Sequence, residues 1–256
     1  MATSRCMAVG KLRLHLGCGR QLLAGYVNID GTARPETALD LERDVLGLNF
    51  PEGSVAEIRH HHMFEHFHRY QAVALVAAWN LWLAPGGRLT IETPDFYGAS
   101  RRYVRAHGVL GALRRLLWRR DTERECWLVL RHLFGSKEAP WASHLEGWDA
   151  FTLGTLYRDF GFRLVQVQES SGILPSVTAF GRKTMRLDPS QFRSRAAGFL
   201  KRLAWHDGEL AIWIAEAEKT FSGLLGAPLV NESLLATWRD RTPTNVAPER
   251  AGERGT

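Results

Sequence analysis

Two glycines and an acidic residue near the start of the chain form a pattern suited to ligand binding. The segment LHLGCGR turns at Gly17 and Gly19, and the segment YVNID that follows ends at Asp30. Glycine lets the backbone turn sharply and approach a ligand closely. A carboxylate at the end of the next strand can accept hydrogen bonds from ribose hydroxyls. The pattern therefore predicts a site for a molecule that contains a nucleoside.

The glycine pattern is incomplete for a dinucleotide. The motif G-x-G-x-x-G expects a third glycine where this chain has Leu22, and the phosphate loop G-x-x-x-x-G-K-[ST] is also missing. These features disfavour a nicotinamide-dependent dehydrogenase. A nucleoside without phosphates fits better, and S-adenosylmethionine is the commonest such molecule.

Six segments of the chain carry information through their order and spacing. They are LHLGCG (14–19), LAGYVNID (23–30), LNFPEGSVAEI (48–58), FEHF (64–67), LAPGGRL (83–89) and TPDF (93–96). Together they resemble a class I S-adenosylmethionine-dependent methyltransferase, and most closely the branch called methyltransferase type 11. The resemblance covers roughly the first hundred residues and returns at 149–167.

The resemblance implies a fold and an activity. The expected fold is α/β, with a Rossmann-like methyltransferase sheet that is mostly parallel and has a late antiparallel strand, a helical insertion and a C-terminal helical appendage. The expected activity is methyl transfer from S-adenosylmethionine to a small or medium-sized acceptor, such as a sugar, a lipid or a secondary metabolite, with S-adenosylhomocysteine as product. The expected cofactor-binding residues are Gly17, Cys18, Gly19, Asp30, Asp44 and His62.

Two of these assignments depend on the resemblance alone. Asp44 matches the acidic position near the adenine amine, but Asn49 replaces the proline of the usual L-P-F pattern, so Asp40 is an alternative. His62 is expected to lie beside the methionine part of the cofactor through its backbone.

The candidates for a general base, or for a group that orients the acceptor, are His66, Asp95 and His144. A histidine ring titrates near neutral pH, which suits proton removal from a hydroxyl or amine acceptor. Aromatic residues near these candidates could wall the acceptor pocket, namely Phe96, Tyr97, Trp141 and Trp148.

The histidine run at 60–62 raises the question of a metal site. Consecutive strand residues point to opposite faces, so these three rings cannot all bind one ion, and the order H-E-x-x-H is missing. We therefore assign no metal ligands from the sequence. A site assembled from His62, Glu65 or His66 is the alternative.

The pattern of apolar residues and turns predicts alternating strands and helices. Strands are expected at 12–17, 26–30, 55–61, 88–93, 163–168 and 177–180, and a helix at 69–83 that stops at the Pro-Gly-Gly turn. A second helix should end at Gly161. We divide the chain into a methyltransferase domain (1–187, with a helical insertion at 98–143), a helical extension (188–240) and a disordered tail (241–256).

In the insertion, Leu110, Leu113, Leu116 and Leu117 form an apolar stripe. In the extension, two helices should be separated near Gly208 and should pack on the core or join two copies in a homodimer.

Composition limits the remaining possibilities. The chain has 256 residues, a formal net charge of +6, and no apolar run long enough to cross a membrane. Its three cysteines show no metal or disulfide spacing, which favours the cytoplasm. Arginines crowd the stretch 101–131, so a nucleic-acid methyltransferase is one alternative, although the N-P-P-[YW] type of motif is missing. The second alternative is a non-catalytic binding or scaffold protein that has kept the cofactor pocket.

Overall fold

A computed structural model describes residues 12–33, 38–108, 122–170 and 174–230. The strands are β1 (Leu12–Leu16), β2 (Val27–Asp30), β3 (Leu41–Glu42), β4 (Val55–His61), β5 (Leu83–Pro94), β6 (Phe162–Glu169) and β7 (Ser176–Lys183). The α-helices are α1 (Arg69–Trp82), α2 (Phe96–His107), α4 (Thr122–Phe134), α5 (Ala150–Asp159), α6 (Phe192–Leu200) and α7 (Asp207–Gly226). Short 3₁₀ helices are η1 (Val45–Gly47), η2 (Phe64–His66), η3 (Pro140–Ala142) and η4 (Pro189–Gln191).

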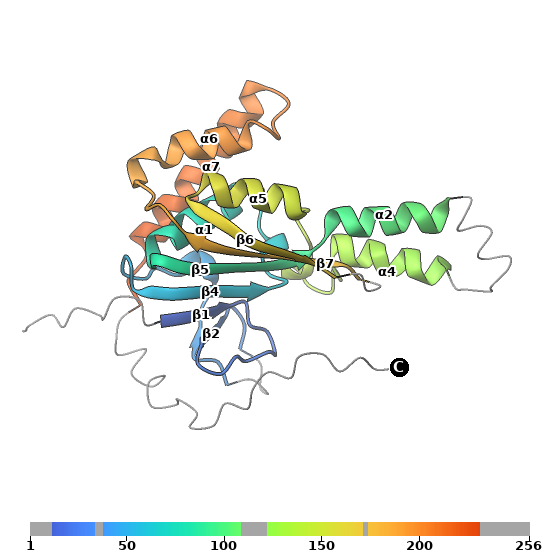
Figure 1. Ribbon diagram of the computed structural model, residues 1–256, viewed down its shortest axis with the longest axis horizontal. Coiled ribbons are helices and arrows are strands. Elements are labelled where there is room, and N and C mark those ends of the chain that lie inside the picture. The colour runs from blue at the N-terminus through green and yellow to red at the C-terminus, as the bar shows by residue number, and fades with distance from the viewer. Residues whose placement is uncertain (1–11, 34–37, 109–121, 171–173, 231–256) are drawn as a thin grey trace, which may run out of the picture.

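The strands form one sheet within the described ranges, in the order β3-β2-β1-β4-β5-β7-β6 (Figure 1). β1 to β5 pair in parallel, whereas β7 is antiparallel to both β5 and β6. The expected fold class, an α/β fold with a mostly parallel sheet and a late antiparallel strand, is confirmed. Chain order reverses between β1 and β4, and open α/β sheets bind ligands at the carboxyl ends of strands beside such a switch point.

The predicted strands match the observed ones within a few residues, except at the start of β5 and at the short strand β3. β4 spans the predicted residues, but β5 begins at Leu83 rather than at 88. Leu83 pairs with Val55, an irregularity follows, and regular pairing resumes where Arg88 faces Glu57. The sequence analysis missed β3, because two residues at a sheet edge are too few for a hydrophobic pattern.

Helix α1 is buried on almost every side, because the sheet packs on one side of it and α6 and α7 pack on the other. The amide of Asn80 is fully buried in this layer. It donates to the carbonyls of Phe160 and Met185 at 2.9 and 3.0 Å and accepts from the amide of Leu187 at 2.8 Å. A buried polar side chain with all these partners fixes the end of α5 and the start of the C-terminal extension against α1.

The insertion is helical where it is described. α2 and α4 pack against each other and project from the edge at which β5 ends (Figure 1). α2 begins at Phe96, two residues before the expected boundary at 98. The guanidinium of Arg102 pairs with Glu125 across the two helices, and that of Arg101 lies over the ring of Tyr97. The predicted leucine stripe lies outside the described residues.

The C-terminal extension packs on the core, which was one of its two expected placements. α6 and α7 cover α1, and the rings of Phe192 and Phe221 stack at 4.1 Å between them. Gly208 was expected between the helices but lies inside α7, because the His206 ring caps this helix by accepting from the amide of Glu209. The tail 241–256 lies outside the described residues. In the described ranges, not even the longest helix is apolar enough to span a bilayer.

Candidate functional site

The two glycines lie where β1 ends, against the end of β2. Gly17 and Gly19 have φ values of 61° and 54°, in the left-handed region that favours glycine. The turn is fixed to the neighbouring strand by two hydrogen bonds. The amide of Cys18 donates to the carbonyl of Ile29 at 3.2 Å, and the amide of Gly19 donates to the carboxylate of Asp30 at 2.8 Å.

The Asp30 carboxylate is held in place yet keeps free capacity to accept hydrogen bonds. Oδ2 accepts from Gly19, Oδ1 accepts from the amide of Thr32 at 3.1 Å, and the side chain is partly exposed. A carboxylate has about four lone-pair sites. Two backbone donors therefore leave about two acceptor sites, one on each oxygen, which is the number that a ribose diol requires.

A side chain larger than that of glycine would also clash at position 17 with the segment that follows β4. A Cβ at this position would lie 2.7 Å from the side-chain sulfur of Met63, which follows β4. Met63 is buried against the glycine turn. The ends of β1 and β4 are thus in direct contact at the switch point.

Asp44 and Asp40 both have structural partners. The Asp44 carboxylate caps η1 by accepting from the amide of Leu46 at 2.9 Å. The Asp40 carboxylate accepts from the backbone amide of Asn28 at 2.8 Å and from its side chain at 3.1 Å. Asp40 is thus bound from two sides to the interior of β2, which leaves Asp44 as the assignment we retain for the adenine.

His62 follows β4 with φ of 47°, unusual for a residue other than glycine. Its amide donates to the carbonyl of Glu92 at 2.9 Å, so this part of its backbone belongs to the sheet. Its ring Nδ1 lies 3.3 Å from Oε1 of Glu65. Burial alone would lower the pKa of His62, but the carboxylates of Glu65 and Glu92 outweigh burial and raise it.

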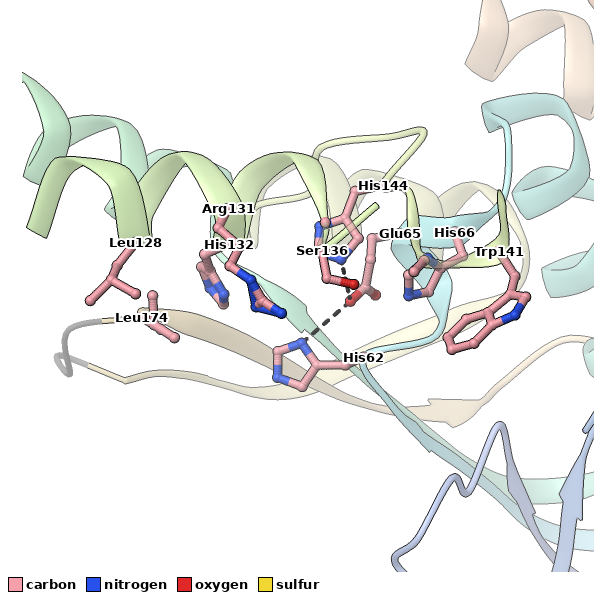
Figure 2. A pocket seen from close by; sticks show the side chains of 12 residues that line it. His62, Glu65, His66, Leu128, Arg131, His132, Ser136, Trp141, His144 and Leu174 are labelled. Atoms are coloured by element: carbon pink, nitrogen blue, oxygen red, sulfur yellow. Dashed lines mark ion pairs between the residues drawn. The ribbon is translucent and has the colours of Figure 1, made fainter. Parts of the chain in front are cut away.

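A pocket of about 290 Å³ opens beside His62, at the carboxyl end of β4 (Figure 2). Its walls come from η2, from α4 and from the loop around η3. The lining residues are His62, Glu65, His66, Leu128, Arg131, His132, Gly135, Ser136, Trp141, Ala142, His144 and Leu174.

Two of the three predicted catalytic residues meet in this pocket. The rings of His66 and His144 lie 4.9 Å apart, edge to face. In Figure 2 the Glu65 carboxylate lies between them. His66 Nδ1 is 3.0 Å from the carbonyl of Ser143, so this nitrogen is the donor, and in the neutral form of the ring the lone pair is on Nε2.

The loop that carries His144 is fastened to η2. The amides of Leu145 and Glu146 both donate to the backbone carbonyl of Glu65, at 2.8 and 3.2 Å. The Glu146 carboxylate also pairs with Arg69 at 2.7 Å, and that guanidinium lies over the ring of Trp213 in α7. The histidine pair is thus held by hydrogen bonds and by the C-terminal extension.

Asp95 is not among the residues that line this pocket, although its amide and the ring of His132 both bind the carbonyl of Pro175. It precedes α2, is 3% exposed, and its carboxylate packs so closely on Gly98 that a Cβ there would lie 2.3 Å from Oδ2. A catalytic role for Asp95 stays a prediction.

Burial keeps two pocket histidines neutral at neutral pH. Burial lowers the pKa of His144, although the Glu65 carboxylate opposes the shift. Burial also lowers the pKa of His132, whose Nε2 lies 2.7 Å from the carbonyl of Pro175. Sequence reasoning missed His132 and Arg131, because the face that α4 presents to the site depends on how the insertion folds back.

Two further histidines are buried within the strands that support the site. Burial lowers the pKa of His15 in β1 to about 4 and that of His60 in β4 well below its usual 6.5. His60 is fully buried against Phe64 and Trp79. Both rings stay neutral in the folded protein at pH values at which the unfolded chain protonates them.

We predict that acid destabilises the fold through these rings. The unfolded state binds more protons between pH 6.5 and the folded pKa, so stability falls as the pH decreases through this window. From pH 7.5 to 5, His15 alone accounts for about 2 kcal/mol of the unfolding free energy. Urea unfolding at pH 7.5 and at pH 5 should show this loss of unfolding free energy. The loss should be smaller in His60→Phe than in the unchanged protein. Equal losses in the two proteins would contradict the role of His60.

Several solved structures are similar to this chain at low sequence identity. A 1,6-didemethyltoxoflavin-N1-methyltransferase of Burkholderia thailandensis, with bound 1,6-didemethyltoxoflavin and S-adenosylhomocysteine, is 16% identical with a TM-score of 0.45, over 69% of this chain and 72% of that chain. An S-adenosylmethionine-dependent methyltransferase of Mesorhizobium loti is 17% identical with a TM-score of 0.43, over 68% and 92%. Another, of Methanosarcina mazei, is 14% identical with a TM-score of 0.42, over 70% and 94%. No protein-family model and no curated protein matches the sequence.

Proposed function

We propose that the protein transfers a methyl group from S-adenosylmethionine to a small or medium-sized acceptor, such as a sugar, a lipid or a secondary metabolite, and releases S-adenosylhomocysteine. One observation carries this proposal. The amide of Gly19 holds the Asp30 carboxylate at the switch point of the sheet, where the carboxylate retains acceptor capacity for a ribose.

The residues around this carboxylate fit the cofactor. Asp30 would bind the ribose, the turn at Gly17, Cys18 and Gly19 would lie against the methionine part, and Asp44 would lie near the adenine. When bound, S-adenosylmethionine supplies an electrophilic methyl group on a positively charged sulfur. His62 at the end of β4 would line the passage between this site and the pocket of Figure 2.

The pocket has the composition expected of an acceptor site. Leu128, Trp141 and Leu174 give it an apolar wall, whereas His66 and His144 present polar atoms. His66 Nε2 has a free lone pair and a ring that Ser143 orients, so it would take the proton that a hydroxyl or amine acceptor loses. Arg131 would attract an acidic group of the acceptor.

The partners and location that we expect follow from this assignment. The acceptor is a small molecule, and a cytoplasmic location stays a prediction. We also retain the homodimer through the C-terminal helices, which would cover Trp205 and Ile212, 94% and 65% exposed.

Turnover tests the proposed function. The purified protein is incubated with methyl-labelled S-adenosylmethionine and a pool of small-molecule extracts, and S-adenosylhomocysteine and labelled products are measured. We expect both to form together in at least one fraction, and not in protein inactivated by heat. Tight binding of S-adenosylhomocysteine without turnover in any fraction would favour the non-catalytic alternative.

A further inference from the structure

Three electron-pair donors converge in the pocket from two segments of the chain. Glu65 and His66 lie in η2, and His144 lies in the loop that follows η3. One donor atom from each side chain lies within 4.8 Å of the other two. This spacing is wider than the distance of about 3.3 Å between neighbouring ligands of a tetrahedral zinc ion. Side-chain movements of about 1 Å would close the difference.

The two oxygens of the Glu65 carboxylate have different surroundings. Oε2 accepts from the Thr93 hydroxyl at 3.1 Å, which anchors the side chain. Oε1 is buried, and no group in the described part of the chain makes a well-aligned hydrogen bond to it. It lies 3.9 Å from Nε2 of His144 and 3.3 Å from Nδ1 of His62. A carboxylate oxygen that is buried without such a bond is costly unless a cation lies against it.

His66 is oriented as metal ligands usually are. The carbonyl of Ser143 accepts from Nδ1 of His66 at 3.0 Å, and the rings of His66 and His144 lie 4.9 Å apart. A hydrogen bond at one ring nitrogen fixes the tautomer and directs the other nitrogen at the metal. The hydrogen bonds from Leu145 and Glu146 to the Glu65 carbonyl hold the two segments together without any ion.

We propose that Glu65, His66 and His144 bind a divalent transition-metal cation. Two imidazoles and one carboxylate suit Zn²⁺, Fe²⁺ or Co²⁺ better than Mg²⁺ or Ca²⁺, which prefer oxygen ligands alone. Three protein ligands leave a coordination position that faces the pocket, as in catalytic zinc sites. An oxygen of the acceptor would bind there and lose its proton more easily, and with the ion bound Nε2 of His66 would be a metal ligand instead of the proton acceptor proposed above. Metal binding itself does not depend on the proposed methyl transfer.

The test measures binding of the metal alone. Full-length protein without a histidine tag is treated with a chelator and titrated with Zn²⁺ by calorimetry, and Co²⁺ is added separately to record its visible absorption. We expect one ion per chain. Glu65→Gln and His144→Gln should each weaken Zn²⁺ binding by about 100-fold or more and remove the Co²⁺ bands. His61→Gln, from the same histidine run but paired with Glu92, should bind within about threefold of the unchanged protein.

Two different substitutions are used in case one of them prevents folding. Glutamine at position 65 keeps an oxygen that can accept from Thr93, and His144→Gln leaves Glu65 unchanged. Thermal unfolding of the metal-free variants identifies which of them remain folded. The proposal is overturned if the unchanged protein shows no saturable Zn²⁺ binding. It is equally overturned if a folded Glu65→Gln or His144→Gln variant binds Zn²⁺ as tightly as His61→Gln does.

Discussion

Asp30→Ala is expected to weaken the binding of S-adenosylhomocysteine by roughly 30- to 1,000-fold, which corresponds to about 2 to 4 kcal/mol. The carboxylate would lose two hydrogen bonds to the ribose, and bonds to a charged group are the stronger kind. Calorimetric titration of the variant and the unchanged protein measures the difference.

Controls separate this loss from a change in the turn, because Asp30 also binds the amides of Gly19 and Thr32. Asp30→Asn keeps one side-chain oxygen and should lose less affinity than Asp30→Ala. Glu52 precedes β4, and its carboxylate pairs with Arg186. Glu52→Gln removes this carboxylate and should leave the affinity for S-adenosylhomocysteine within about twofold of that of the unchanged protein. Affinity unchanged in a folded Asp30→Ala protein would refute the ribose assignment.

His66→Gln should lower the turnover number by about 100- to 10,000-fold, the usual range for the loss of a general base. Glutamine can keep a hydrogen bond to the Ser143 carbonyl but cannot take up a proton. Gly17, Gly19 and Asp30, the residues proposed to bind the cofactor, are not among those that line the pocket, so affinity for S-adenosylhomocysteine should stay the same. Steady-state rates with an acceptor found by the extract assay measure the effect.

The matched variant for this experiment is His61→Gln, which changes a neighbouring histidine that lies against His15 and Glu92 instead of the pocket. Turnover of His66→Gln within threefold of that of His61→Gln would show that His66 neither accepts the proton nor holds a catalytic ion. If His66→Gln loses activity, titration of this variant with Zn²⁺ distinguishes a proton acceptor from a metal ligand at position 66.

The contact between the glycine turn and Asp30 was predictable because its pattern is local. Gly17, Gly19 and Asp30 lie on two successive parallel strands, and the carboxyl ends of such strands meet at one edge of the sheet. The contact between Gly17 and Met63 could not be predicted in the same way, since it depends on how the chain turns after β4.

The acceptor side was only partly predictable. His66 and His144 were chosen for their chemistry, but their contact depends on the return of the chain after the insertion, which the hydrogen bonds to the Glu65 carbonyl fix. Glu65 entered the sequence analysis as an alternative metal ligand, and its burial follows only from the packing around it. Asp95 was correctly placed near a strand end, yet the sequence did not show that its side chain would be packed against Gly98.

Titration of the unchanged protein with S-adenosylhomocysteine tests the central claim most directly. We predict saturable binding of one molecule per chain, and a complex in which each oxygen of the Asp30 carboxylate accepts from one ribose hydroxyl. A folded protein that releases no heat with this ligand, or a complex whose ribose lies away from Asp30, would contradict the account.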